Sequence, residues 1–300
     1  MTPAALLAAV SIAFPPEGAK LPCIERCYVM GAADAGEEVT RFRVSGSGFR
    51  VPVEKTGAWA TVIDVKPGTN VVEVGGVRRT FVVGSLGPLG SKEPKRTYTK
   101  LEYAADRAKP HPEGKKPEEI TVVIDAGHGG QDNGAMSPHG LPEKDANLRL
   151  AKALRDELKR RGYTVVMTRE DDAFVELYDR PKVAHRANAD LFVSIHHNAP
   201  GYASNPFAIR SQSVYAWNAL GEGLAKAINV RMAAADPTLR NDGVLHANFA
   251  VTRNPEIPSC LIEADFITHP DGECAAWDAA RRPAIAAAIA DGIADWVAGK

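Results

Sequence analysis

Downstream of Glu119, short apolar runs alternate with longer amphipathic segments, and this alternation restricts the possible folds more than any other feature of the sequence. The apolar runs read ITVVID, YTVVMTR, DLFVSIH, SVYAW and CLIEADF. The segment from Leu148 to Gly162 carries an apolar stripe and ends at a glycine, which predicts a helix. Further helices are predicted over LYDRPKVAHRANA, from Ala219 to Ala235 and from Trp277 to Trp296. Continuous apolar strands between helices predict an α/β domain over residues 119–300, with a mainly parallel sheet flanked by helices.

The N-terminal part of the chain has a different pattern. From Val10 to Val83, short β-branched runs are separated by Gly, Pro and Asp, which is typical of a small all-β sandwich. Residues 1–86 therefore resemble an Ig-like accessory domain. Between them and the α/β domain, residues 87–118 are rich in Pro, Gly and Lys and are expected to form a linker.

Charge and hydropathy exclude two classes of partner. The 300 residues contain 36 Lys and Arg and 37 Asp and Glu, so no global field draws the chain to nucleic acid or to an anionic membrane. No apolar run reaches the roughly 18 to 20 residues that span a bilayer, so we expect no transmembrane segment. The apolar run from Ala4 to Phe14 lacks a preceding Lys or Arg, which argues against a signal peptide but leaves a trimmed secretion signal open.

The four cysteines form two local pairs, Cys23 with Cys27 and Cys260 with Cys274. Neither pair has the CxxC spacing of a zinc knuckle or a redox loop, so a cysteine metal cluster is not expected. An exported protein could oxidise either pair, depending on the distance between the two Cα atoms. Between Cys23 and Cys27 we expect a bridge rather than two packed thiols.

Polar side chains follow three of the predicted strands, where open α/β sheets gather their reactive groups. ITVVID leads to His128, DLFVSI leads to His196 and His197, and CLI leads to Glu263. Because strand side chains alternate between faces, only one of the two adjacent histidines is expected to reach a common centre. Glu143 precedes the Leu148 helix and can return to the same edge. Two imidazoles and one carboxylate form the ligand set of a catalytic zinc site.

Glycines surround the first of these histidines. Gly127, Gly129 and Gly130 permit backbone conformations that other residues avoid, and we expect them to let substrate approach closely. A phosphate-binding loop is the competing interpretation of such a turn. The sequence contains neither GxxxxGK[ST] nor GxGxxG here, so we discount it.

Four segments then resemble, in the same order, the signature segments of one family, the amidase-3 family of N-acetylmuramoyl-L-alanine amidases. They are DAGHGGQDNGA (Asp125 to Ala135), Glu143 in LPEKDAN, SIHHNA (Ser194 to Ala199) and SCLIEADF (Ser259 to Phe266). The resemblance implies that His128, Glu143 and His196 bind one zinc ion and that Glu263 is the catalytic carboxylate. His197 stands where the family usually has a small residue, so it is expected to pack or to support a ligand.

The resemblance also implies a reaction and a place. Peptidoglycan would be the partner, and the amide between the lactyl group of N-acetylmuramic acid and the L-alanine of the stem peptide would be hydrolysed by zinc-activated water. Glu263 would take a proton from that water and pass it to the departing amine. The protein would be exported to the periplasm or cell envelope, and the sequence identifies no activator protein. The alternatives are a zinc peptidase that cuts within the stem peptide and a non-catalytic protein that binds the cell wall.

The chain departs from the family in specific places. It reads Ala264-Asp265-Phe266 where relatives commonly have Leu-Gly-Phe. Asp265 could tune Glu263 by like-charge repulsion or could face the other way and bind a backbone amide, and we expect the second arrangement. Arg169 and Arg180 are expected to be structural ion-pair partners rather than substrate clamps. Residues 200–211 are too few for the self-blocking helix that some relatives insert there.

Overall fold

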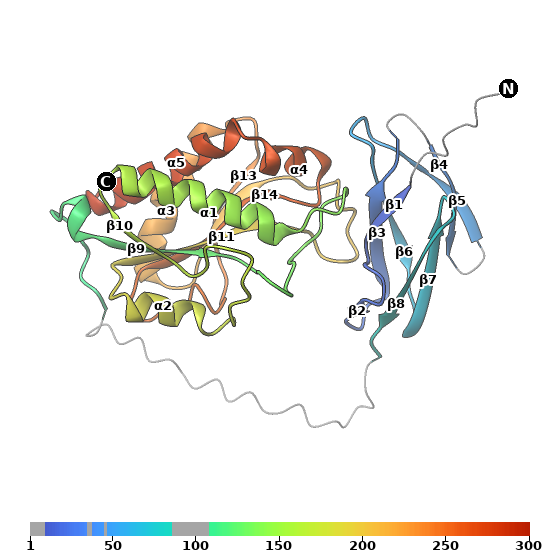
Figure 1. Cartoon of the computed structure of the whole chain (residues 1–300), viewed down its shortest axis with the longest axis horizontal. Helices are drawn as coiled ribbons and strands as arrows, with labels where there is room; N and C mark the ends of the chain where they lie inside the picture. Colours follow the sequence, from blue (N-terminus) through green and yellow to red (C-terminus); the bar gives the residue numbers. More distant parts are fainter. Residues whose placement is uncertain (1–9, 35–37, 45–46, 86–107) are drawn as a thin grey trace.

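The computed structural model describes residues 10–34, 38–44, 47–85 and 108–300, which form two bodies of secondary structure (Figure 1). The start of the Ala4–Phe14 run lies outside the described residues, as do residues 87–107 of the predicted linker. Within the described ranges, no helix combines the length and apolar character that crossing a membrane requires.

The N-terminal body consists of two β-sheets packed face to face. The three-stranded sheet has the order β1 (Ser11–Phe14), β3 (Arg26–Ala32) and β6 (Ala58–Asp64). The five-stranded sheet has the order β2 (Lys20–Leu21), β8 (Val77–Val83), β7 (Gly68–Val74), β4 (Glu38–Val44) and β5 (Ser47–Pro52). Phe42 and Phe81 from the larger sheet share one buried core with Trp59 from the smaller sheet. The expected all-β fold is confirmed.

The expected Cys23–Cys27 bridge is wrong. Cys27 lies on β3 with its side chain buried between the sheets, where its thiol donates to the carbonyl of Tyr28 at 3.1 Å. Cys23 is exposed ahead of that strand, and both thiols are free. The second pair is also free, with Cys260 buried and Cys274 exposed.

The C-terminal body is built on one six-stranded sheet. Its strand order is β10 (Thr164–Met167), β9 (Thr121–Ala126), β11 (Leu191–Asn198), β14 (Ser259–Phe266), β12 (Gln212–Ala216) and β13 (Asn241–His246). The first four strands of that order are parallel to one another, whereas β12 is antiparallel to β14 and parallel to β13. The mainly parallel sheet is therefore confirmed, and β13 is an additional edge strand.

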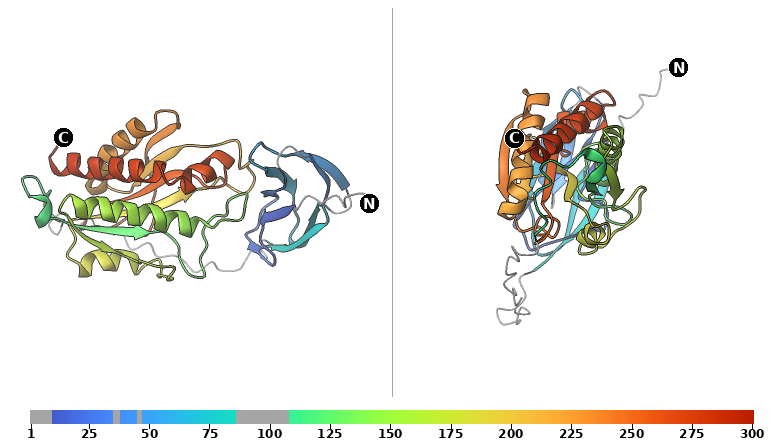
Figure 2. Two further views of the ribbon diagram at one scale, coloured as in Figure 1. Left: turned by 45° about the horizontal axis from the view of Figure 1, so that its top comes forward. Right: turned by 90° about the vertical axis from the view of Figure 1, so that its left-hand side faces the viewer.

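Helices cover both faces of this sheet (Figures 1 and 2). One face carries α1 (Glu143–Arg160), α3 (Ala219–Ala235) and α5 (Arg281–Val297), which share the main hydrophobic core with the strands. The short helix α2 (Arg180–Arg186) lies on the other face, where Ala184 packs against Val123 and Phe192.

Three helices differ in their bounds from the prediction, and α2 is shorter at both ends than the predicted segment LYDRPKVAHRANA. Helix α1 starts at Glu143 instead of Leu148. The prediction began too late because it followed the apolar stripe, and the first turn of the helix is polar. The closing helix expected from Trp277 to Trp296 begins instead at Arg281, as α5, and a separate helix, α4 (Pro270–Trp277), precedes it. Asp278 separates them, since its backbone is extended and its Oδ1 accepts a hydrogen bond from the amide of Ala280 at 2.8 Å.

The N-terminal body contacts loops at the carboxyl edge of the six-stranded sheet. Tyr202, in the segment that follows β11, accepts a hydrogen bond from the amide of Tyr28 at 2.7 Å and packs its ring near Phe14 and Tyr28. His139, in the loop ahead of α1, lies with its Nε2 3.1 Å from the carbonyl oxygen of Thr56. Residues 200–211, which contain two turns and no helix, thus contact the N-terminal body through Tyr202.

Part of the predicted linker also packs on the α/β body. The amide of Lys109 donates to the carbonyl of Glu256 at 2.8 Å, and its ammonium group bonds Asn188. Lys115 forms an ion pair of 2.7 Å with the nearly buried Asp190. These contacts hold Lys109 and Lys115 against loops of the α/β body.

Candidate active site

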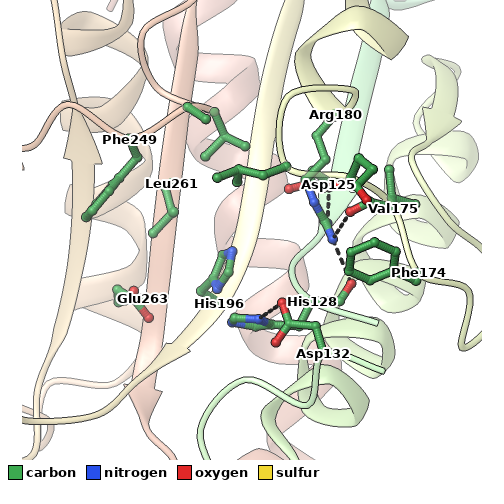
Figure 3. Close-up of a pocket in the computed structure, with 14 residues that line it drawn as sticks. Asp125, His128, Asp132, Phe174, Val175, Arg180, His196, Phe249, Leu261 and Glu263 are labelled. Carbon is green, nitrogen blue, oxygen red and sulfur yellow. Dashed lines mark hydrogen bonds and ion pairs between the residues drawn. The ribbon is translucent and has the colours of Figure 1, made fainter. Parts of the chain in front are cut away.

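Three neighbouring strands bring the predicted site residues to one edge of the sheet (Figure 3). His128 follows the end of β9, His196 lies near the end of β11, and Glu263 lies on β14 directly opposite His196 in the strand register. Glu143 reaches the same place from the first turn of α1. The sequence-based expectation of a common centre therefore agrees with the geometry.

His128, Glu143 and His196 form a compact cluster, in which one potential ligand atom from each lies within 4.8 Å of the others. His128 Nε2 is 3.1 Å from Glu143 Oε2, and His196 Nδ1 is 2.9 Å from Glu143 Oε1. Donor atoms of a tetrahedral zinc site, with bonds of about 2.0–2.1 Å, lie roughly 3.3 Å apart. The donor types and their spacing fit a divalent metal.

The electrostatics of the cluster also favour a cation. Burial lowers the pKa of His128, but hydrogen bonds to Asp132 and Glu143 and the charges of these carboxylates raise it to about 10 overall. Burial raises the pKa of Glu143, whereas His128 and His196 hold it well below its ordinary value. Positive charge is therefore strongly stabilised at this point.

Asp132 orients the first histidine and was not identified from the sequence. Its Oδ2 lies 2.8 Å from His128 Nδ1, and its Oδ1 accepts a hydrogen bond from the amide of Gly134 at 3.0 Å. This contact turns His128 Nε2 toward Glu143. Carboxylates that bond the far nitrogen of a ligating histidine are a common feature of metal sites. The available signal was an acid four residues after the histidine in the AGHGGQD segment.

The glycine-rich turn makes room mainly for protein side chains. A Cβ added at Gly127 would overlap the imidazole of His196, and one added at Gly134 would collide with Glu143 and His128. Gly129 and Gly130 have positive φ angles, as expected. The expectation that these glycines serve substrate approach is thus corrected, because the protein itself occupies the adjacent space: His196 at Gly127, Ala173 and Arg169 at Gly129, and Phe174 at Gly130.

A buried polar network fixes the turn that carries His128. Arg180 donates to Asp125 Oδ1 at 2.8 Å and to the carbonyl of His128 at 2.9 Å. Arg169 instead donates to the carbonyl oxygens of Ala126 and Gly127. The expectation of structural ion pairs is confirmed for Arg180, while Arg169 supports the same turn through carbonyl groups.

The two adjacent histidines point to opposite faces of β11, as strand alternation predicts. His197 is buried, and its Nδ1 lies 2.8 Å from Asn147 Oδ1. Burial lowers the pKa of His197 to about 4. His196 alone joins the cluster, and His197 lies behind it.

Glu263 lines the same pocket as His128 and His196 (Figure 3). Its Oε2 is buried and has no hydrogen-bond partner in the part of the chain that the structure describes. Burial, followed by the negative charge of Glu143, raises the pKa of Glu263 well above its ordinary value. A carboxyl group in such surroundings is suited to exchange a proton with a reacting molecule.

Asp265 faces away from this pocket. It is fully buried, accepts a hydrogen bond from the amide of Phe266 at 2.8 Å, and pairs with Arg210 through both carboxylate oxygens. The predicted backbone contact is confirmed, and the ion pair with Arg210 adds a second structural function.

The pocket has a volume of about 460 Å³. It lies beside α2, on the same face of the sheet as that helix. Apolar side chains line it on both sides of the polar cluster. On one side they come from the loop ahead of α2 and on the other from β14 and the loop after β13; they are Phe174, Val175 and Leu177, and Phe249, Ala250, Val251 and Leu261. The pocket thus places apolar surface next to the cluster of His128, Glu143 and His196, which can hold a metal ion.

The His-Glu-His cluster beside the buried carboxyl group of Glu263, at the carboxyl edge of a mainly parallel sheet, defines an α/β enzyme with a candidate metal site. Residues 122–295 match the family model for N-acetylmuramoyl-L-alanine amidase of the amidase-3 type. The chain belongs to this family of peptidoglycan hydrolases, and the resemblance seen in the sequence is confirmed.

Individual relatives agree with this assignment. The chain is 34% identical over 218 residues to the N-acetylmuramoyl-L-alanine amidase AmiA of Escherichia coli (strain K12), over 57% of this chain and 74% of AmiA. The solved structure of the amidase AmiC2 of Nostoc punctiforme has a TM-score of 0.56 and 35% identity, covering 59% of this chain and 97% of AmiC2. The catalytic domain of the amidase CwlV from Bacillus (Paenibacillus) polymyxa var. colistinus has a TM-score of 0.56 and 34% identity, covering 60% of this chain and 99% of that domain.

Proposed function

We propose that the protein uses zinc to hydrolyse the amide between the lactyl group of N-acetylmuramic acid and the L-alanine of the stem peptide in peptidoglycan. The observation that carries this proposal is the cluster of His128, Glu143 and His196 beside Glu263 in one pocket. Zinc bound by the first three residues would supply a Lewis acid that polarises the amide carbonyl and makes water more acidic.

Glu263 acts as the proton carrier in this proposal. Its Oε2 takes a proton from the attacking water while the water oxygen bonds to the amide carbon. The same carboxyl group then gives a proton to the departing nitrogen as the C–N bond breaks. The products are a free lactyl carboxylate on the sugar and a peptide with an N-terminal alanine amine.

The apolar wall of the pocket suits the groups that flank this amide. The lactyl and alanine residues each carry a methyl group next to the scissile bond, and Leu261, two residues before Glu263 on β14, lines the same pocket together with Val251. Burial of these methyl groups favours binding by roughly 25 cal/mol per Å² of apolar surface removed from water. The pocket thus supports a substrate with small apolar groups around a central amide.

Membership of a cell-wall amidase family implies action in the cell envelope. We propose export to the periplasm or cell surface. The N-terminal body is proposed to be an Ig-like accessory domain that holds the enzyme on the wall polymer.

Product analysis tests the proposal against a zinc peptidase. Purified peptidoglycan is digested by the full-length protein in buffer, in chelator, and in chelator followed by added Zn²⁺, and the new termini are identified by mass spectrometry. We expect free lactyl carboxylates and N-terminal alanine, lost in chelator and restored by zinc. New termini within the stem peptide would identify a peptidase, and no new termini under any condition would indicate a non-catalytic wall-binding protein.

A further inference from the structure

The carboxylate of Glu143 is held from two sides. Its Oε2 accepts a hydrogen bond from the amide of Ala135 at 2.9 Å. Its Oε1 accepts hydrogen bonds from Asn147 Nδ2 at 3.0 Å and from the amide of His197 at 3.2 Å. Because its side chain is almost fully buried, these donors determine which way its oxygens face.

Asn147 lies one helical turn after Glu143 on α1 and is fully buried. Its Nδ2 also lies 3.3 Å from the carbonyl oxygen of Gly127, in the turn that leads to His128. Its Oδ1 lies 2.8 Å from His197 Nδ1. An amide oxygen only accepts and an amide NH₂ only donates, so the contact with His197 fixes the NH₂ group toward the carboxylate.

His197 thus contacts this arrangement twice. Its backbone amide reaches Glu143 directly, and its imidazole donates from Nδ1 to Asn147. The residue before it, His196, is a proposed metal ligand that points to the other face of β11. One short strand segment therefore contributes a ligand on one face and a support for another ligand on the opposite face.

We propose that Asn147 and His197 act as one positioning unit, which sets the carboxylate of Glu143 and the Gly127 turn in the geometry that binds the metal. This inference rests on the metal site of the proposed function. It assigns the two residues an effect on metal affinity that packing alone would not produce. Contacts around ligating groups typically change metal affinity or activity by about 10–100-fold when they are removed.

The test measures metal binding separately from stability in the full-length protein. Asn147→Leu and His197→Phe remove the polar groups with little change in volume, and a double variant combines them. His197→Gln keeps a side-chain amide that can donate to Asn147. Asn229→Leu is the matched control, since Asn229 is a nearly buried asparagine of α3 that bonds Asn241 instead of the site.

Three measurements are made on each variant: the Zn²⁺ dissociation constant by competition with a chelator, the visible absorption of the Co²⁺ form, and the melting temperature of the metal-free form. We expect Asn147→Leu to weaken Zn²⁺ binding by about 10–100-fold and to alter the Co²⁺ spectrum. The effect of His197→Phe should be smaller, and the double variant should bind no more weakly than Asn147→Leu, because the two residues act in series. His197→Gln should recover most of the affinity, and Asn229→Leu should lose stability alone.

Unchanged Zn²⁺ affinity and an unchanged Co²⁺ spectrum in Asn147→Leu, with a lower melting temperature, would reduce the pair to core packing and overturn the inference. Independent, additive losses in the double variant would overturn the idea of one unit. If Asn147→Leu does not fold, Asn147→Ser provides the same comparison. A wild-type protein that binds neither metal would instead overturn the proposed metal site itself.

Discussion

His128 has a left-handed backbone conformation, with φ near +61°. For a residue with a Cβ such a conformation costs about 1–3 kcal/mol, and it persists only where the surroundings impose it. Here Arg180 binds the carbonyl of His128, and Asp132 binds its ring. The strained backbone of His128 thus helps to direct its Nε2 toward Glu143. This position of the strain agrees with the proposed function of His128 in binding metal.

Replacing Glu263 by glutamine tests the proton carrier. The amide is nearly isosteric with the carboxyl group but cannot accept a proton, so Glu263→Gln should retain zinc and lose activity by at least about a hundredfold. Zinc content by elemental analysis and the rate of muropeptide hydrolysis are measured on the same sample.

Glu170→Gln serves as the control, because Glu170 is an exposed carboxylate outside the pocket. It should leave both quantities unchanged. Activity of Glu263→Gln within a few-fold of wild type would assign the proton transfer to another group.

The site was predictable from the sequence only where the chain direction determines position. His128, His196 and Glu263 follow or end apolar strands, so their common edge could be inferred from the strand pattern. For Asp132 the only local signal was its place four residues after His128. Asn147 acts through hydrogen bonds of its side chain, and nothing in a local pattern indicates where a side chain on a buried helix face will point. The ion pair between Asp265 and Arg210 could not be predicted either, because the two residues lie 55 positions apart in the chain.

At the level of elements, helices and strands with a strong apolar pattern could be predicted from the sequence, and those with a weak apolar pattern could not. The bounds of α3 agree with the prediction at both ends, and β9, β11 and β14 occupy the predicted apolar runs. The edge strand β13 has the sequence NDGVLH, which carries few apolar residues because it is only half-covered, and it was missed. Helix α1 begins earlier than its apolar stripe, which placed Glu143 on a helix instead of in a loop.

That early start matters for the site. Acidic side chains in the first turn of a helix are stabilised by its N-terminal partial charge, and Glu143 and Asp145 both lie there. With Glu143 on the first turn, Asn147 stacks below it on the same face. Helix α1 therefore positions a proposed metal ligand and its support as one rigid element.

On the scale of the whole molecule, we propose that the catalytic domain begins near Lys109 rather than Glu119. Lys115 neutralises the nearly buried carboxylate of Asp190, and the ring of His111 packs edge-on against Trp296 at 4.6 Å. A fragment that starts at residue 119 loses both contacts, whereas one that starts at residue 108 keeps them.

Two truncations measure this boundary. Leaving a buried charged or polar group without its partner costs about 1–3 kcal/mol, so the 119–300 fragment should melt several degrees below the 108–300 fragment. Both should hydrolyse soluble muropeptides. In the longer fragment, Lys115→Met should lower the melting temperature, whereas Lys116→Met, at a neighbouring exposed lysine, should not. Equal melting temperatures of the two fragments would contradict the proposed boundary.

Comparison of the 108–300 fragment with the full-length protein tests the function of the N-terminal body. If the β-sheets anchor the enzyme, their removal should reduce activity on intact sacculi more than on soluble muropeptides, because tethering raises the effective substrate concentration only on an insoluble polymer. Equal loss on both substrates would instead assign the β-sheets to bracing the loops that they contact through Tyr202 and His139.

The metal content of the purified protein tests the central claim most directly. Two histidines and one carboxylate should hold about one zinc per chain, and His128→Ala or His196→Ala should abolish zinc binding and activity together. Elemental analysis and sacculus digestion are performed on the same preparations, with circular dichroism to verify folding. A folded wild-type protein that contains no metal and digests peptidoglycan normally in chelator would contradict the account.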